Sequence, residues 1–144
     1  MGQQQLLLIV LGVIIVGVAV AVGVTQFRSS AIDSNRQAVI SDVVNLAAKA
    51  QRYYRTPESL AGGGQDFDGL YLSAVDTGNA NGSYSLSTSA PSGATYVAGS
   101  VSPCDTSDHQ TVYIIGCGKE KNGSNYVKVY ATVSQNNIAT SILN

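Results

Sequence analysis

The residues able to perform acid–base or metal chemistry are few, and they do not form a catalytic set. His109 is the only histidine of the chain, and it follows Asp105 and Asp108 in the segment CDTSDH. A histidine in such a polar segment is more typical of a solvated loop than of an acid–base or metal site. The sequence has no Ser/His/Asp set, phosphate-binding loop or nucleophile elbow. We therefore expect no enzyme and no cofactor.

Two short patterns concern ligands and modification. Asp66 and Asp68 resemble a fragment of a calcium-binding loop, but the other ligand positions are missing, which leaves calcium as a minor alternative. Asn81 and Asn122 each begin an Asn-Gly-Ser tripeptide, which matches the acceptor motif for N-linked glycosylation. Both are possible glycosylation sites, and the many Ser and Thr residues are an alternative for O-linked sugar.

The two cysteines, Cys104 and Cys117, favour a disulfide. If oxidised, the pair closes a short loop and adds about 3 kcal/mol in the chain-entropy model. Disulfides persist in oxidising compartments, which a domain translocated behind an apolar helix would reach. Two free, buried thiols are the alternative. No spacing of cysteine and histidine matches a haem or zinc site.

Length and charge restrict the class of protein. The chain has 144 residues, a net charge of −1 and only 12% charged residues. A nucleic-acid-binding surface needs a basic stripe, and charge-driven disorder needs a high net charge, so the sequence favours neither. The length predicts one compact domain in addition to an apolar segment.

The apolar segment covers residues 6–24 and reads LLLIVLGVIIVGVAVAVGV. It is long enough to cross a bilayer as a helix, which satisfies its own backbone polar groups. Gly12, Gly17 and Gly23 interrupt the larger side chains, and small residues let helices approach closely. We interpret the segment as a helix that can reside in lipid and pack against copies of itself. A single-span anchor is the main alternative, and a secretory signal peptide or a buried core helix fits less well.

The helix is expected to continue to about residue 55. Across residues 25–55 apolar side chains recur three or four positions apart, and charged residues take most other positions, as in an amphipathic helix. Pro57 ends the pattern, because the residue before a proline is biased away from the helical region. The result is one continuous helix of about 54 residues, roughly 80 Å long. Its expected packing stripe consists of Phe27, Ala31, Val39, Val43, Leu46, Ala47, Ala50 and Tyr54.

A loop and then a sheet are expected after the helix. Residues 58–82 carry many turn signals, and we expect a surface crossover that reaches neighbouring subunits. Five apolar residues are candidates to pin this loop onto the helix: Phe67, Leu70, Tyr71, Leu72 and Val75. Four segments have the pattern of strands, namely residues 84–87, 95–98, 111–115 and 126–133, and residues 138–143 are expected to add an edge strand.

Asn122-Gly123 is the strongest hairpin signal in the chain. If these two residues form the turn, Lys121 pairs with Ser124 and Ile114 pairs with Ala131. Facing pairs share one face of a sheet. The expected apolar face, which should pack on the helix stripe, consists of Val112, Ile114, Val127, Val129, Ala131 and Val133.

This order of features resembles type IV pilins and their relatives. The shared features are an apolar run that continues into an amphipathic helix, a glycine-rich loop, an antiparallel sheet and a C-terminal cysteine pair. The resemblance implies an α+β fold in which the C-terminal half of a long helix packs on a small antiparallel sheet. It divides the chain into a hydrophobic helix (1–27), its amphipathic continuation (28–56), a glycine-rich loop (57–82) and a sheet head (83–144). Beyond residue 56 it concerns architecture only.

In that family the apolar helices leave the membrane and bundle at the axis of an extracellular helical filament. The resemblance therefore implies a self-associating structural subunit, an inner-membrane pool before assembly, and contact with a pilus assembly machinery. The residues implied in assembly and core packing are Gln5, Leu6, Gly12, Gly17, Gly23 and Phe27. A monomeric membrane-anchored extracytoplasmic binding domain and a minor pseudopilin of a secretion system are the alternatives.

The chain departs from the family pattern in two respects. Counted from Met1, Gln5 stands where the family has a glutamate, and its amide can hydrogen-bond a neighbour without placing a carboxylate in hydrocarbon. If Met1-Gly2 is removed as a leader, Leu7 takes that place instead. The mid-helix proline of the family is also absent, so we expect any unwinding inside a filament to centre on residues 17–23, where each glycine costs about 1 kcal/mol relative to alanine.

Overall fold

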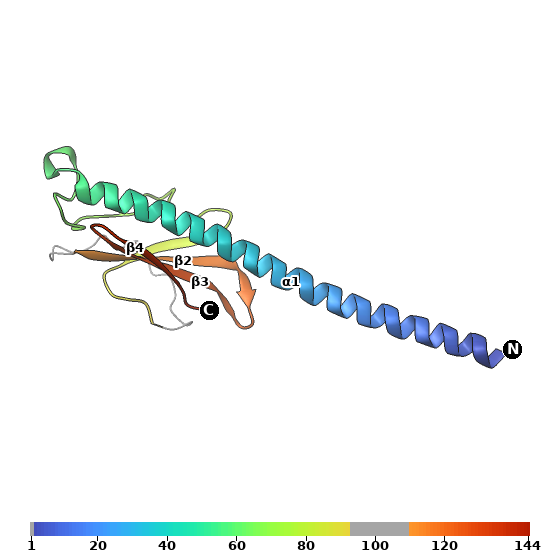
Figure 1. The fold of residues 1–144 in the computed structure, drawn as a ribbon. Coiled ribbons are helices and arrows are strands. Elements are labelled where there is room, and N and C mark those ends of the chain that lie inside the picture. The colour runs from blue at the N-terminus through green and yellow to red at the C-terminus, as the bar shows by residue number, and fades with distance from the viewer. Residues whose placement is uncertain (1, 93–109) are drawn as a thin grey trace.

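The computed structural model describes residues 2–92 and 110–144. A long helix, α1 (Gly2–Arg55), and a short 3₁₀ helix, η1 (Glu58–Leu60), precede four strands: β1 (Gly82–Ser87), β2 (Thr111–Asn122), β3 (Asn125–Ser134) and β4 (Ile138–Ile142). The strands form one antiparallel sheet in the order β1-β2-β3-β4. The fold is α+β, with the sheet along the C-terminal half of α1 and the N-terminal half projecting away from it (Figure 1).

The predicted single helix is confirmed, because α1 has 54 residues without interruption. It contains no proline, and Pro57 follows shortly after its end. Two basic residues, Arg52 and Arg55, lie in the last turn, where positive charge interacts favourably with the helix dipole. The Thr56 hydroxyl donates to the Arg52 carbonyl over 2.8 Å and satisfies one of the terminal acceptors.

The hydrophobic core lies between one stripe of α1 and one face of the sheet. All six residues of the predicted apolar face of the sheet are fully buried, which confirms that face. The helix contributes fewer residues than predicted: Phe27 is 80% exposed and Ala31 is also exposed, because neither lies on the side of α1 that faces the sheet. The buried helix residues are Val39, Val43, Leu46, Ala47, Ala50 and Tyr54.

Gly116 of β2 lets the helix approach the sheet closely. A Cβ atom at this position would lie 2.7 Å from Val39 Cγ1 and 2.8 Å from Val43 Cγ2. Both valines are fully buried. A larger residue at position 116 would therefore push α1 away from the sheet.

The β2–β3 hairpin has a two-residue turn, but not at the predicted residues. Asn122 pairs with Asn125, so the central residues of the turn are Gly123 and Ser124. Gly123 has a φ of 67°, and a glycine with positive φ at the first central position is typical of a type II′ turn. The prediction of Asn122-Gly123 as the central pair is wrong by one position, because the glycine takes the first place that requires positive φ.

The pairing near the turn is shifted as a consequence. Lys121 pairs with Tyr126 rather than with Ser124, so the predicted register is wrong at this end. An irregularity in β2 on the N-terminal side of Lys121 absorbs the difference. Beyond it, Ile114 pairs with Ala131 as predicted, which keeps the apolar face intact.

The loop between η1 and β1 is pinned to the helix by fewer residues than expected. Phe67, Leu70 and Leu72 are buried, and the Phe67 ring packs 4.9 Å from the Tyr54 ring. Tyr71 and Val75 are 69% and 83% exposed, so their predicted pinning role is wrong. In the extended stretch around Tyr71, side chains alternate between the core and the solvent, and Tyr71 points outward.

The predicted edge strand is confirmed as β4. Asn144 prolongs its pairing with β3: Asn144 Oδ1 accepts from the Lys128 N–H over 2.8 Å, and Asn144 Nδ2 donates to the Tyr126 carbonyl over 2.7 Å. The strand predicted at residues 95–98 lies outside the described residues.

Candidate functional site

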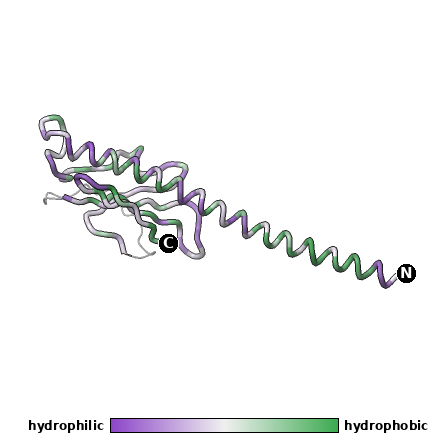
Figure 2. The backbone as a smooth tube through the Cα atoms, viewed as in Figure 1, coloured by the Kyte–Doolittle hydropathy of each residue, from purple (hydrophilic) through white to green (hydrophobic). Residues whose placement is uncertain are grey.

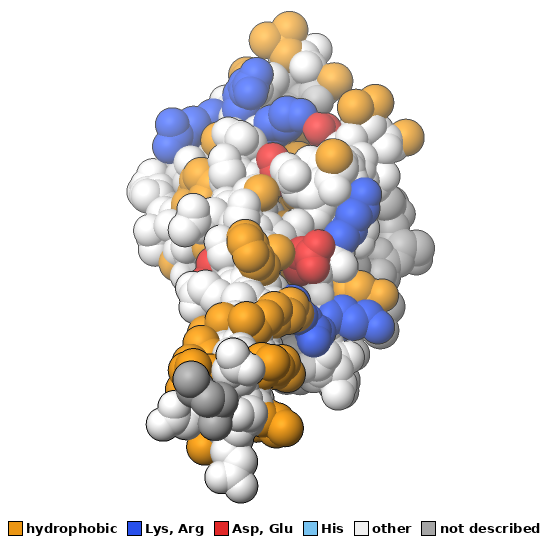
Figure 3. Space-filling view, turned by 90° about the vertical axis from the view of Figure 1, so that its right-hand side faces the viewer, with side chains coloured by type: hydrophobic (Ala, Val, Ile, Leu, Met, Phe, Trp, Pro, Cys, Tyr) orange, Lys and Arg blue, Asp and Glu red, His pale blue; other side chains and the backbone are white. Residues whose placement is uncertain are grey.

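Among residues 2–92 and 110–144, nothing covers the apolar side chains in the N-terminal half of α1. The fourteen Val, Leu and Ile side chains between residues 6 and 24 are each 46–69% exposed. Its most apolar 18-residue window has a mean hydropathy of 3.2, and none of it is buried, so the helix meets the length and composition needed to cross a membrane. Figure 2 shows the apolar run along the projecting half, and Figure 3 shows apolar side chains gathered on it, with the charged ones on the head.

The assembly residues predicted from the sequence lie along this projecting half. Gln5 and Leu6 are exposed near its start, and Phe27 is exposed where it meets the head. A Cβ atom at Gly12, Gly17 or Gly23 would meet nothing within 4 Å. The described part of a single chain therefore does not require a glycine at these three positions.

One side of α1, which we call the outward row, faces away from the sheet along almost the whole helix. The turn of about 100° per residue places it opposite the buried stripe. A helix side that faces water usually carries charged residues, but this row carries none before Arg52. Gly17 lies on another side of the helix. The residues of the outward row, beside the larger Ile9, Val16 and Phe27, are Gln5, Gly12, Ala19, Gly23, Ser30, Ser34, Gln37, Ser41, Asn45 and Ala48.

A second set of contacts, centred on Asp42, fastens the head to the helix. Asp42 Oδ2 accepts hydrogen bonds from Tyr84 Oη over 2.6 Å and from Asn79 Nδ2 and Asn81 Nδ2 over 2.8 Å each. Burial by itself would raise the pKa of the Asp42 carboxyl, but the bonds from Asn81, Tyr84 and Asn79 together lower that pKa. Burial first, and then the neighbouring Asp42, raise the pKa of the Tyr84 hydroxyl.

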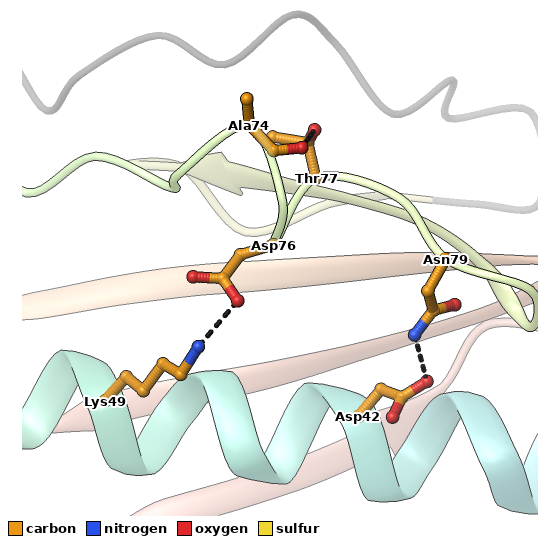
Figure 4. Close-up of polar contacts among 6 residues, drawn as sticks. All are labelled: Asp42, Lys49, Ala74, Asp76, Thr77 and Asn79. Atoms are coloured by element: carbon orange, nitrogen blue, oxygen red, sulfur yellow. Dashed lines mark hydrogen bonds and ion pairs between the residues drawn. The ribbon is translucent and has the colours of Figure 1, made fainter.

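Residues seven positions apart on α1 hold the segment that leads into β1. Asn35 Nδ2 donates to the Asn81 carbonyl over 2.9 Å, and Lys49 Nζ forms an ion pair with Asp76 Oδ1 over 2.6 Å. Asp42 lies midway between these two helix residues in the sequence. Figure 4 shows its bond to Asn79 and, further along α1, the Lys49–Asp76 pair. Sequence reasoning missed this polar row. The signal was the seven-residue spacing of Asn35, Asp42 and Lys49 beside the apolar stripe.

The two Asn-Gly-Ser tripeptides have different surroundings. Asn81 Nδ2, the atom that a glycan would occupy, is the donor to Asp42. Asn122 is exposed at the end of β2, beside the turn. Glycosylation at either residue stays a prediction, and only Asn122 presents its amide to the solvent.

The remaining sequence candidates form no ligand site among the described residues. The Asp68 N–H donates to Asp66 Oδ1 over 3.2 Å, which is a local loop contact. Within residues 2–92 and 110–144, no group of three or more His, Cys, Asp or Glu side chains is arranged to hold a metal. Cys104 and His109 lie outside the described residues, so the predicted pairing of Cys104 with the half-buried Cys117 stays a prediction.

Comparison of the chain with protein-family models, with curated proteins and with solved structures finds no match in any of the three. The functional evidence is therefore the exposed apolar half of α1, the uncharged outward row and the contacts of the head. Together these describe a chain whose head is fastened to one half of a helix and whose other half is apolar and exposed.

Proposed function

We propose that this chain is the structural subunit of an extracellular helical filament, similar to a type IV pilus, and that it polymerises through residues 1–27. The main support is the projecting half of α1, which is apolar on every side and is covered by no other part of the chain that the structure describes. The head is attached only to the other half of the helix. Each copy thus combines a folded head with an exposed apolar segment, residues 6–24, which we call the stalk.

Exposure of the stalk to water is unfavourable, so the stalk needs an apolar environment to cover it. Burying one large apolar side chain is worth about 1.5–3 kcal/mol, and the stalk carries fourteen Val, Leu and Ile residues. Lipid and a bundle of identical helices both remove this cost, and the two environments are similarly apolar. Close packing between helices must therefore make the polymer more stable than the membrane-inserted monomer.

The observation that favours a polymer over a membrane anchor is the extent of the outward row. Lipid accounts for an apolar run at residues 6–24, but it does not account for an uncharged helix side that continues to Ala48. Small and uncharged side chains allow another helix to lie close to the backbone. A neighbouring copy packed along α1 accounts for both halves of the row at once.

The proposal includes a sequence of locations. The stalk resides in the inner membrane before assembly, and a pilus assembly machinery then transfers the subunit to a cell-surface filament. The contacts of Asp42 and Lys49 hold the head on the helix during this transfer. A minor pseudopilin of a secretion system would use the same fold in a short, low-abundance assembly.

Electron microscopy of sheared cell-surface material tests the proposal. Long fibres composed mainly of this chain, identified by mass spectrometry, would support it. Recovery of the chain only as detergent-soluble monomers from membranes would instead support a monomeric membrane-anchored extracytoplasmic binding domain.

A pair of variants separates helix packing from membrane insertion. Gly12→Leu keeps the run apolar and suits a lipid-embedded helix, but it places a bulky side chain on the outward row. We expect normal membrane insertion, a folded head and a strongly reduced fibre yield. Val13→Leu, one residue further along and off that row, is the control and should assemble normally. Normal fibre yield from Gly12→Leu would argue against close packing at this side.

A further inference from the structure

The chain contains two Asn-Gly bonds, and both belong to the same tripeptide, Asn-Gly-Ser. They begin at Asn81 and at Asn122. Because the residues that follow each asparagine are identical for two positions, local sequence does not distinguish their reactivity. Any difference in chemistry between them must come from the fold.

An asparagine followed by glycine can deamidate without an enzyme. The backbone nitrogen of the glycine attacks Cγ of the asparagine, which forms a new N–Cγ bond, while the Cγ–Nδ2 bond breaks and Nδ2 leaves as ammonia with the proton of the amide. Water then opens the five-membered imide and gives an aspartyl or isoaspartyl residue. Glycine favours the attack because it has no Cβ atom and is conformationally permissive.

The fold restrains both reacting groups at Asn81. The leaving group, Asn81 Nδ2, donates to the Asp42 carboxylate over 2.8 Å. The nucleophile, the Gly82 N–H, donates to Asn79 Oδ1 over 3.1 Å. Ring closure at this site would break both hydrogen bonds and would move the first residue of β1.

At Asn122 no hydrogen bond from the described residues restrains either group. Asn122 is exposed, and the following Gly123 is an exposed turn residue with a φ of 67°. Within the described part of the chain, the Asn122 side chain has no hydrogen-bond partner. A Cβ atom at Gly123 would meet nothing within 4 Å, which shows that the space around the turn is open.

From this contrast we propose that Asn122 is a site of spontaneous deamidation, and that Asp42 and Asn79 protect Asn81 from the same reaction. The product carries a new carboxylate at the tip of the β2–β3 hairpin, which changes the net charge of the chain from −1 to −2. The isoaspartyl form also adds one methylene to the backbone beside the turn. The fraction of chains with a converted Asn122 should therefore increase with the age of the protein.

The test compares the two sites within one sample of full-length protein in detergent. After incubation at mildly alkaline pH, peptide mapping by mass spectrometry measures the conversion of each asparagine. In folded protein we expect Asn122 to convert at least about tenfold faster than Asn81, the factor that one charge-assisted hydrogen bond corresponds to. In concentrated urea the two rates should become equal, since the tripeptides are identical.

Two results would overturn the proposal. One is equal conversion at both sites in the folded protein, and the other is no conversion at Asn122 under conditions where the urea sample converts. A preference for Asn122 that persists in urea would likewise place its cause outside the fold. Asn122→Gln supplies the control peptide, which should show no product.

Discussion

Tyr84 Oη donates a hydrogen bond to Asp42 Oδ2 over 2.6 Å, and this bond joins strand β1 to the middle of the long helix. The same carboxylate oxygen also accepts from Asn79 and Asn81, which lie in the segment that leads into β1. One helix residue therefore orients the loop, the strand and α1 relative to each other. This makes the head a fixed extension of the helix.

Removal of the Asp42 carboxylate should destabilise the head. In Asp42→Ala three donors lose their acceptor. We expect a loss of about 2–3 kcal/mol in the free energy of unfolding, which is the value of one hydrogen bond to a charged group, because water can replace the acceptor for the less buried Asn79 and Asn81. Urea unfolding of the full chain in detergent, followed by near-UV circular dichroism, measures the loss. Asp33→Ala removes an exposed partner of Arg36 and should change stability by about 0.5 kcal/mol or less. Equal effects of the two variants would contradict the role of Asp42.

The same pair gives the head a defined dependence on pH. The pKa of Asp42 is lowered in the folded state, so its stabilising effect is complete above the unfolded-state value of about 3.9 and is lost as the pH falls below it. The pKa of Tyr84 is raised, so its effect is complete below the unfolded-state value of about 10 and is lost as the pH rises above it.

A urea series across pH measures both limits. Stability should decline below about pH 4 and above about pH 10, by the unfolded-state values of the two groups. Asp42→Asn should weaken the decline in acid, and Tyr84→Phe should weaken the decline in alkali. If both variants retain the full wild-type profile, the pH dependence arises from other groups.

The parts of the fold that follow from side-chain periodicity were predictable from the sequence. The spacing of Val39, Val43 and Leu46 identified the buried stripe of α1, and alternation identified the apolar face of β2 and β3. The register at the hairpin was not predictable in full. The position of Gly123 within the turn depends on which residue adopts positive φ, and the irregularity in β2 leaves no mark in the alternation.

The candidate site was predictable only in its apolar part. Hydropathy marks residues 6–24 without reference to any contact. The bonds of Asp42 depend on a loop that returns to the helix about forty residues later, and no local pattern shows which asparagine arrives there. Tyr71 shows the opposite error, because its apolar ring indicated burial while the extended backbone turns it outward.

Close contact between the helix and the sheet gives a further prediction at Gly116. Gly116→Ala places a Cβ atom 2.7 Å from Val39 Cγ1 and 2.8 Å from Val43 Cγ2, and we expect a cost of about 1–3 kcal/mol from overpacking. Thermal unfolding of the full chain measures it. Gly17→Ala is the matched control, because its Cβ atom meets nothing and the stability of the head should not change. An unchanged melting temperature for Gly116→Ala would show that α1 can shift away from the sheet at little cost.

The outward row can be tested at Ser41, on the half of α1 that packs on the sheet and away from residues 6–24. Ser41 is exposed on this row, opposite the buried stripe, so Ser41→Lys should leave the free energy of unfolding within about 0.5 kcal/mol of the wild type, as for most surface substitutions. In a filament the same lysine would be buried against a neighbouring helix without a partner for its charge, which is costly. We therefore expect a folded, membrane-inserted subunit and few fibres.

A charge placed elsewhere on the head supplies the comparison for Ser41→Lys. Ser124→Lys adds the same charge at the exposed hairpin turn, off the helix, and should assemble at the wild-type level. Fibre yield by electron microscopy and membrane content by immunoblot distinguish the outcomes. Loss of fibres in both variants would point to a general effect of added charge. Normal fibres in both would restrict the packing surface to residues 1–27 and would leave the uncharged side of the head helix exposed in the polymer.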